Sequence, residues 1–224
     1  MNSSSLNPAE GIGMTSRRTR IRLMDRLAKE GIHNQSVLEA IGDAPRHLFV
    51  DEALASRAYE DTPLPIGHQQ TISQPYVVAL MTQTVIEHAA KLNRILEIGT
   101  GCGYQTCILA RLFNLVYSIE RIESLHRQAR NRLYDLKIRN TYLKHGDGFE
   151  GWLEHSLYDA ILVTAAPQSI PDSLTDQLNL NGVMVLPQGN SHNQRLVILK
   201  KTKSGLTRQE ADQVMFVPML SGVK

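Results

Sequence analysis

The sequence predicts an α/β fold in which a mostly parallel sheet has helices on both of its faces. Two observations carry this prediction: short apolar runs recur along the second half of the chain, and helical patterns separate most of them. Strands that alternate with helices in this way are typical of parallel sheets whose two faces are both covered. Two final apolar runs have no helical pattern between them, which predicts antiparallel strands at one edge of the sheet.

Each strand is predicted from a short run of buried-type residues. The parallel strands are expected at residues 94–98, 114–120, 140–147, 158–164 and 182–187, with helical patterns between the first four and near 171–178. The runs 195–201 and 213–219 are expected to pair as a hairpin through the polar connector "TKSGLTRQEAD". The result is a doubly wound, Rossmann-like sheet with antiparallel C-terminal edge strands.

The first part of the chain is predicted to be helical. Apolar periodicity indicates helices at residues 16–30, at about 35–44 after a cap at Asn34 or Ser36, at 51–58 and at 74–88. The segment 61–73 contains Pro63, Pro65 and Gly67, so we expect it to be irregular.

Composition narrows the class of protein. Of 224 residues, 42% are hydrophobic and 21% are charged, which is ordinary for a soluble globular protein. The net charge of +2 gives no strong field that would favour nucleic acid or a membrane surface. No apolar run approaches the roughly 20 residues that a membrane span needs, and residues 1–14 lack the apolar stretch of a secretory signal.

The two cysteines, Cys102 and Cys107, are too few for a metal framework and badly spaced for a disulfide. We therefore expect reduced thiols, no metal site and a cytoplasmic protein.

A glycine loop, "LEIGTGCGY" (96–104), comes after the first predicted parallel strand and precedes a helix. In doubly wound sheets, ligands bind outside the carboxyl ends of the strands, where the strand order reverses. The spacing of Gly99, Gly101 and Gly103 differs from the usual dinucleotide pattern G-x-G-x-x-G. A carboxylate at Glu97 would repel a pyrophosphate and attract an ammonium group.

Two more acidic residues lie at the ends of neighbouring strands. Glu120 ends the second strand, where a carboxylate can accept both ribose hydroxyls. Asp147 comes after the third strand in "HGDGF" and can accept from an adenine amino group, with Gly148 leaving room for the ring. An amino acid end, a ribose, an adenine and no phosphate describe S-adenosylmethionine. The predicted cofactor residues are Glu97, Gly99, Thr100, Gly101, Glu120, Asp147 and Gly148.

The residues after the fourth strand narrow the range of possible methyl acceptors. Enzymes that methylate amino groups of bases commonly carry an Asn or Asp there, but this chain reads "VTAAPQS" (163–169). Together with the weak net charge, this argues against nucleic acid as the acceptor.

Seven blocks of sequence resemble the bacterial protein-L-isoaspartate O-methyltransferases. They span about residues 16–222 and read "PRHLFVDEA" (45–53), "LPIGHQQTISQPYVVA" (64–79), "LEIGTGCGYQT" (96–106), "YSIERI" (117–122), "HGDGFEGW" (145–152), "YDAILVTAAP" (158–167) and "FVP" (216–218). The block containing "TISQPY" is the specific one, because the glycine loop alone identifies only the wider superfamily. Gln69 and Cys102 depart from the family's usual Gly and Ser.

The resemblance implies a repair enzyme. Such enzymes methylate the α-carboxylate of L-isoaspartyl residues, and of some D-aspartyl residues, in damaged proteins and peptides. The ester then cyclises to a succinimide, whose hydrolysis returns some normal aspartate. By resemblance, Ser73 is the catalytic residue, and Thr71, Ile72, Ser73 and Val217 bind the substrate. We expect a monomer with no nucleic-acid or membrane partner.

The expected organisation is a flexible tail over residues 1–14 and a single methyltransferase domain over 15–224. Within that domain, residues 15–92 would form a helical and substrate-loop part, 93–190 the cofactor-binding core and 191–224 the C-terminal strands.

Three roles are open for Ser73: a nucleophile, a helix cap or part of a binding site. A substrate carboxylate, with a pKa of about 3.5, is already ionised at neutral pH and needs no general base. Pro75 suits a first helical turn, so Ser73 or Gln74 is the expected N-cap. A helix N-terminus attracts carboxylates. We therefore interpret Thr71, Ile72 and Ser73 as a cradle for the substrate carboxylate.

Three alternatives remain open from the residues. One is a methyltransferase that acts on a small-molecule oxygen or on RNA, which the "TISQPY" and "FVP" blocks disfavour. Another is a nucleotide-dependent reductase, which the loop spacing and Glu97 disfavour. The third is a non-catalytic binding module, whose expected mark would be loss of the cofactor acids.

Overall fold

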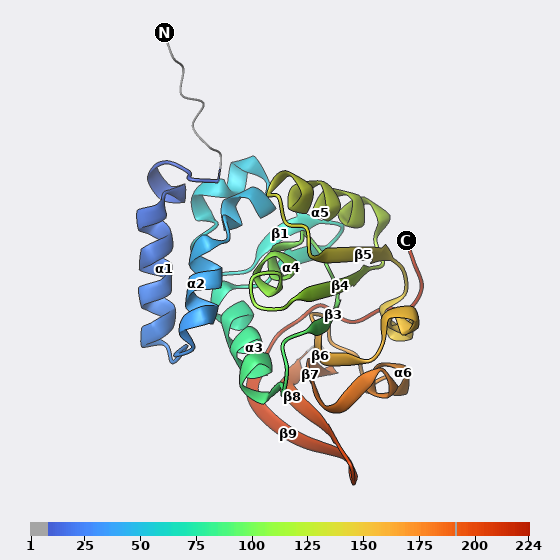
Figure 1. Ribbon diagram of the computed structural model, residues 1–224. Helices are drawn as coiled ribbons and strands as arrows, with labels where there is room; N and C mark the ends of the chain where they lie inside the picture. Colours follow the sequence, from blue (N-terminus) through green and yellow to red (C-terminus); the bar gives the residue numbers. More distant parts are fainter. Residues whose placement is uncertain (1–8, 191) are drawn as a thin grey trace.

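The computed structural model describes residues 9–190 and 192–224. At its centre lies a sheet of seven strands in the order β5-β4-β3-β6-β7-β8-β9 (Figure 1). The strands are β3 (Arg94–Ile98), β4 (Leu115–Glu120), β5 (Thr141–His145), β6 (Tyr158–Val163), β7 (Leu178–Asn190), β8 (Asn193–Thr202) and β9 (Gly205–Val214). Neighbours from β5 to β7 are parallel, while β8 is antiparallel to both β7 and β9. The predicted fold class is confirmed.

The parallel part of the chain begins with β3, which lies in the interior of the sheet beside the middle strand β6. From β3 the chain winds outward through β4 to β5, and then returns to the other side of β3 as β6. The strand order therefore reverses at the carboxyl end of β3, where such folds place their ligands. Every residue of β6 is buried, as expected for a central strand covered on both faces.

Helices surround this sheet. They are α1 (Arg17–Lys29), α2 (Gln35–Asp43), α3 (Pro75–His88), α4 (Tyr104–Leu109), α5 (Glu123–Asp135) and α6 (Asp172–Asp176). Short 3₁₀ helices complete the set: η1 (Gly13–Thr15), η2 (Arg46–Phe49), η3 (Glu52–Arg57), η4 (Gly148–Glu150) and η5 (Leu153–His155). The helical pattern predicted between the third and fourth parallel strands was wrong. Only η4 and η5 lie there, interrupted at Gly151, which has a φ of 66° that ends a helix.

The C-terminal hairpin is displaced from its predicted position. The chain reverses at Lys203 and Ser204, and most of the polar connector at 202–212 forms β9. The predicted strand at 213–219 was wrong beyond Val214. A nearly fully exposed edge strand carries polar side chains on both faces, so β9 shows none of the apolar alternation that predicts strands.

A second small sheet lies in the segment predicted to be irregular. Strands β1 (Leu64–Gly67) and β2 (Gln70–Ile72) pair as a hairpin. Its turn residues, His68 and Gln69, have φ values of 52° and 60°. Two positive φ values are typical of type I′ turns, which favour Asn and Gly. The family's usual Gly would be unstrained at the position where this chain has Gln69. The hairpin also places Ile72 and Ser73 next to the start of α3.

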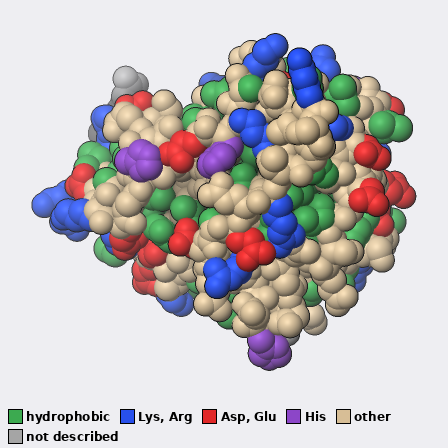
Figure 2. All heavy atoms as spheres, turned by 90° about the horizontal axis from the view of Figure 1, so that it is seen from below, with side chains coloured by type: hydrophobic (Ala, Val, Ile, Leu, Met, Phe, Trp, Pro, Cys, Tyr) green, Lys and Arg blue, Asp and Glu red, His purple; other side chains and the backbone are tan. Residues whose placement is uncertain are grey.

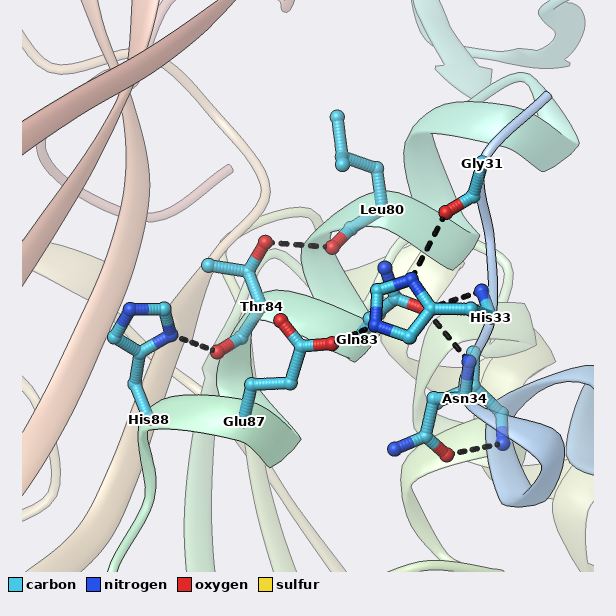
Figure 3. Close-up of polar contacts among 9 residues, drawn as sticks. Gly31, His33, Asn34, Leu80, Gln83, Thr84, Glu87 and His88 are labelled. Atoms are coloured by element: carbon cyan, nitrogen blue, oxygen red, sulfur yellow. Dashed lines mark hydrogen bonds and ion pairs between the residues drawn. The ribbon is translucent and has the colours of Figure 1, made fainter.

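Gln83 fixes α3 to the N-terminal helices (Figure 3). Its Oε1 accepts from the backbone N–H groups of His33 and Asn34, both at 2.8 Å. Asn34 in turn caps α2 by accepting from the Val37 N–H at 3.2 Å, which confirms the predicted cap. An ion pair between His33 Nε2 and Glu87 Oε1 crosses the same junction at 2.8 Å, but its exposure makes it worth little. The rigid attachment matters because α3 begins beside Ser73.

Within residues 9–190 and 192–224, no helix is long and apolar enough to cross a membrane, and no group of three or more His, Cys, Asp or Glu side chains is placed to hold a metal ion. Cys102 and Cys107 are buried free thiols. Residues 1–8 of the predicted tail lie outside the described residues. The Glu10 carbonyl accepts from Arg20 Nη2 at 3.2 Å.

Candidate active site

The glycine loop turns back onto the end of β4. The N–H groups of Gly99 and Thr100 both donate to the Ile119 carbonyl, at 2.9 and 3.2 Å. Gly99 has a φ of 96°, and a Cβ there would collide with the Thr164 hydroxyl. Gly101 and Gly103 also have positive φ values. The loop therefore needs glycine for its backbone geometry and, at Gly99, for its close approach to Thr164.

Glu120 holds this loop from the end of β4. Its Oε2 accepts from the Gly101 N–H at 2.7 Å, and its Oε1 accepts from the Ile122 N–H at 2.9 Å. Both are charge-assisted hydrogen bonds, which are stronger than neutral ones. A carboxylate has about four lone-pair sites, so acceptor capacity remains for a ligand.

Glu97 lies beneath the loop and is fully buried. Its Oε2 accepts from the hydroxyls of Thr106 at 2.5 Å and Ser118 at 2.6 Å, and Ser118 lies 2.6 Å from the Thr100 hydroxyl. Burial raises the pKa of the Glu97 carboxyl to about 8, although the two hydroxyl donors oppose the shift. Glu97 is absent from the walls of the two cavities beside the loop, so its predicted contact with a cofactor ammonium group stays a prediction.

The raised pKa of Glu97 predicts that stability falls as pH rises. Between the ordinary carboxyl pKa of 4.5 and the folded-state pKa of about 8, the folded protein keeps a proton that the unfolded chain releases. The free energy of unfolding should decrease across this window and level off above it. Urea unfolding at a series of pH values should show this slope, and Glu97→Gln should flatten it. An unchanged slope in Glu97→Gln, matching that of the exposed-site variant Glu123→Gln, would contradict the assignment.

Two adjoining cavities open at the carboxyl ends of β3, β4 and β6. The larger, of about 660 Å³, includes Ile66, Ile98, Ile119, Glu120, Ile122 and Gly148 in its walls. The smaller, of about 450 Å³, includes Ile72, Ser73, Met81, Thr100, Cys102, Tyr104 and Gln105. Thr71, Gly99, Gly101 and Thr164 line both. The two cavities together form one elongated site along the glycine loop.

Thr164 is a site residue that was not predicted from the sequence. Its hydroxyl lies 2.9 Å from the Ile98 carbonyl and 2.8 Å from the Gly99 carbonyl, which ties the ends of β3 and β6 together. It also lines a third cavity that contains Ser73. The one sequence signal for Thr164 is its position after the fourth parallel strand. Its side chain gives no further signal, because a hydroxyl is neither the amide nor the acid that base-methylating enzymes carry at that position.

Asp147 is already engaged at the end of β5. Its Oδ1 accepts from the Phe149 N–H at 2.8 Å, and its Oδ2 accepts from the Gly222 N–H at 2.5 Å. The neighbouring Gly148 lines the larger cavity, whereas Asp147 is not among its wall residues. Its predicted contact with an adenine amino group stays a prediction.

Ser73 lies between β2 and α3, at the border of the smaller cavity and the third cavity. Within the described part of the chain its hydroxyl makes no hydrogen bond, and the N-cap of α3 is Gln74. The Tyr76 N–H at the helix terminus donates to Asp61 Oδ1 at 2.8 Å. A carboxylate of the protein therefore already occupies part of the helix N-terminus that was expected to bind substrate.

The other predicted substrate residues lie around Ser73. Thr71 and Val217 line the larger cavity and the third cavity, and Ile72 lines the smaller one. The fold therefore brings Thr71 and Ile72 of β2 close to Val217 of the C-terminal segment, around Ser73.

Comparison with known proteins decides the family. The family model described as protein-L-isoaspartate(D-aspartate) O-methyltransferase matches residues 18–224. The protein-L-isoaspartate O-methyltransferase of Alkalilimnicola ehrlichii is 54% identical over 219 residues, which cover 97% of this chain and 99% of that protein. The chain belongs to the protein-L-isoaspartate O-methyltransferase family. A relative of the same name in Halorhodospira halophila is 54% identical over 96% of this chain and 97% of its own length.

Solved structures of the protein-L-isoaspartate O-methyltransferase family share the fold. One structure with this name superposes with a TM-score of 0.82 at 28% identity, covering 91% of this chain and 67% of that one. A structure from Plasmodium falciparum, described as a family member in complex with S-adenosyl-L-homocysteine, superposes with a TM-score of 0.78 at 27% identity. That match covers 89% of this chain and 97% of the other.

The residues of the elongated site fit S-adenosylmethionine, the cofactor of this methyltransferase family. Glu120 presents a carboxylate to the larger cavity, where ribose hydroxyls would donate. Ile98, Ile119 and Ile122 give that cavity apolar walls suited to a base. The side-chain-free backbone at Gly99 and Gly101 borders the passage into the smaller cavity, which ends at Ser73.

Proposed function

We propose that this protein transfers a methyl group from S-adenosylmethionine to the α-carboxylate of L-isoaspartyl residues, and of some D-aspartyl residues, in damaged proteins and peptides. The ester formed starts repair through a succinimide. The single observation that carries the proposal for the site is the Ser73 hydroxyl. It has no partner in the described part of the chain and lies at the border of the smaller cavity and the third cavity, which shares Thr71, Gln74 and Val217 with an open groove.

The groove gives a protein substrate its way in. It runs between one side of α3 and the segment after β9, with Tyr76, Val77, Leu80, Met215 and Phe216 in its walls. Thr71 and Val217 line both this groove and the larger cavity. A polypeptide lying in the groove can therefore present one side chain to the cofactor cavity while the rest of it stays outside.

The chemistry asks mainly for positioning. S-adenosylmethionine supplies an electrophilic methyl group on a sulfonium. The substrate carboxylate is its own nucleophile at neutral pH, so no residue has to remove a proton. Ser73 orients that carboxylate by donating its hydroxyl hydrogen, and Thr71, Ile72 and Val217 enclose it. Holding the reacting atoms in line can contribute about 7–11 kcal/mol to lowering the barrier.

We also propose that the protein is a cytoplasmic monomer that uses neither nucleic acid nor membrane as a partner. The buried free thiols at Cys102 and Cys107 suit a reducing compartment. On the face shown in Figure 2, basic and acidic side chains are interspersed and not grouped by sign. A face of this kind, together with the net charge of only +2, offers little attraction for a polyanion.

A methyl-transfer assay tests the proposed function. The purified protein is incubated with tritiated S-adenosylmethionine and either an isoaspartyl peptide or its normal aspartyl twin. Label should enter the isoaspartyl peptide and not its twin. Equal labelling of the two would contradict the assignment. Two further measurements test the alternative activities. Labelling of an RNA substrate would indicate an RNA methyltransferase, and binding of NADH in a titration would indicate a nucleotide-dependent reductase.

A further inference from the structure

The C-terminal strap, which we define as residues 215–224, crosses the carboxyl edge of the sheet. In Figure 1 it runs from the β8–β9 hairpin to the side of β4 and β5. It forms an isolated bridge to Ala166, with hydrogen bonds of 2.8 Å from the Ala166 N–H to the Val217 carbonyl and from the Met219 N–H to the Ala166 carbonyl. Further along, Gly222 donates to Asp147, and Lys224 donates to the Arg121 carbonyl at 2.7 Å.

The strap contributes to both halves of the proposed active site. Its first residues, Met215 and Phe216, line the substrate groove, and Pro218, Met219 and Leu220 line the larger cofactor cavity. Val217 lines both. The position of Met215, Phe216 and Val217 therefore determines where the substrate groove ends and the cofactor cavity begins.

A single buried amide holds that start. Gln194, on β8, is only 4% exposed. Its Oε1 accepts from the Phe216 N–H at 2.7 Å, and its Nε2 donates to the Phe216 carbonyl at 3.0 Å. Both polar atoms of the side chain are thus used on one residue. They extend the backbone pairing of β8 and β9, which ends at Gln194 and Val214, by one more step.

Packing and hydrogen bonds together hold the strap. Phe216 and Met219 each pack against a hydrophobic core cluster. Pro218, Met219 and Leu220 also line two cavities, the cofactor cavity and one bordered by Phe149, Gln168 and Gly189, so packing around them is incomplete and their hydrogen bonds contribute to their position. Gln194 makes the first hydrogen bonds of the strap, next to Val217.

We propose that Gln194 is a positioning residue for methyl transfer, which sets Phe216 and Val217 at the boundary between the substrate groove and the cofactor cavity. Gln194 also lines the substrate groove, but both polar atoms of its side chain bond to the backbone of Phe216, and it acts through that backbone. The proposal rests on the proposed function, since Val217 is a substrate contact only if an isoaspartyl polypeptide is the acceptor.

The test replaces Gln194 with Met, which keeps the volume and removes both hydrogen bonds. Loss of two buried hydrogen bonds should raise the KM for an isoaspartyl peptide about tenfold and lower kcat as well. The Kd for S-adenosylhomocysteine, measured by calorimetry, should change by less than about threefold, because the contacts at Ala166, Asp147 and Arg121 remain. Hydrogen exchange of peptides covering residues 215–220 should become faster without added ligand.

Gln209→Met, at an exposed position on β9, is the matched control and should leave the kinetic constants, the Kd and the hydrogen exchange unchanged. If Gln194→Met folds poorly, Gln194→Asn keeps the amide but is too short to reach both Phe216 atoms, and it should show the same pattern. Wild-type kinetics and exchange in a folded Gln194→Met would overturn the proposal. A wild-type protein that does not methylate the peptide would instead count against the proposed function, while the exchange result would still test the contact.

Discussion

Replacing Glu120 with alanine is expected to weaken the binding of S-adenosylhomocysteine by about 100-fold, or about 2.7 kcal/mol. The variant loses the two charge-assisted hydrogen bonds that hold Gly101 and Ile122, at 2.7 and 2.9 Å. It also loses the carboxylate that faces the larger cavity. A hydrogen bond to a charged group contributes about 1.5–3 kcal/mol, so loss of the proposed contact with the ribose hydroxyls would by itself account for most of the expected effect. Isothermal titration calorimetry measures it directly.

Glu123→Ala is the matched control for this experiment. Glu123 also carries a carboxylate, lies three residues further along and is exposed at the start of α5. Its replacement should leave the Kd within about twofold of the wild-type value, because exposed charges at this distance contribute little. Equal weakening in both variants would show that general electrostatics, and not the Glu120 contacts, determine affinity.

Ser73→Ala is expected to lower kcat on an isoaspartyl peptide about 100-fold while leaving the Kd for S-adenosylhomocysteine almost unchanged. Negative charge leaves the carboxylate as the methyl group arrives, so the hydroxyl cannot act by stabilising developing charge there. Its contribution is orientation, and a misplacement of about 1 Å can cost a factor of about 100 in rate. Steady-state kinetics with the peptide and calorimetry with the product cofactor separate the two quantities.

The structure also separates this effect from loss of a helix cap. Gln74 is the N-cap of α3, and the Ser73 side chain makes no capping hydrogen bond. Thermal stability of Ser73→Ala should therefore stay close to that of the wild type, as should that of Ser56→Ala at an exposed position in η3. A loss of about 1 kcal/mol in stability with unchanged turnover would mean that Ser73 supports the fold and not the reaction.

The sequence predicted the parallel core well because its strands are buried on both faces. The run of β6 is apolar except for Asp159, so its pattern is visible without knowledge of its neighbours. The grouping of Gly99 and Glu120 was predictable for a related reason, since the carboxyl ends of adjacent parallel strands meet at one edge. Because these strand ends lie close together, the Glu120 carboxylate can accept from the Gly101 N–H of the glycine loop.

Features that depend on distant partners left no local pattern. β9 is polar because it is an exposed edge, and the β1–β2 turn uses His68 and Gln69 where Asn and Gly would have signalled it. Gln194 is indistinguishable in sequence from a surface glutamine, since its partner is the backbone of Phe216. Thr164 was passed over because a hydroxyl at a strand end has many ordinary uses.

The carboxylate of Asp61 at the start of α3 bears on which proteins can be repaired. Its hydrogen bond to the Tyr76 N–H offsets the partial positive charge that this helix end would otherwise show to an incoming acid. Recognition of the substrate is thereby shifted from long-range attraction to shape and short-range hydrogen bonds. We therefore expect this site to give little preference for acidic over basic proteins, which would suit damage that arises by spontaneous chemistry in proteins of any charge.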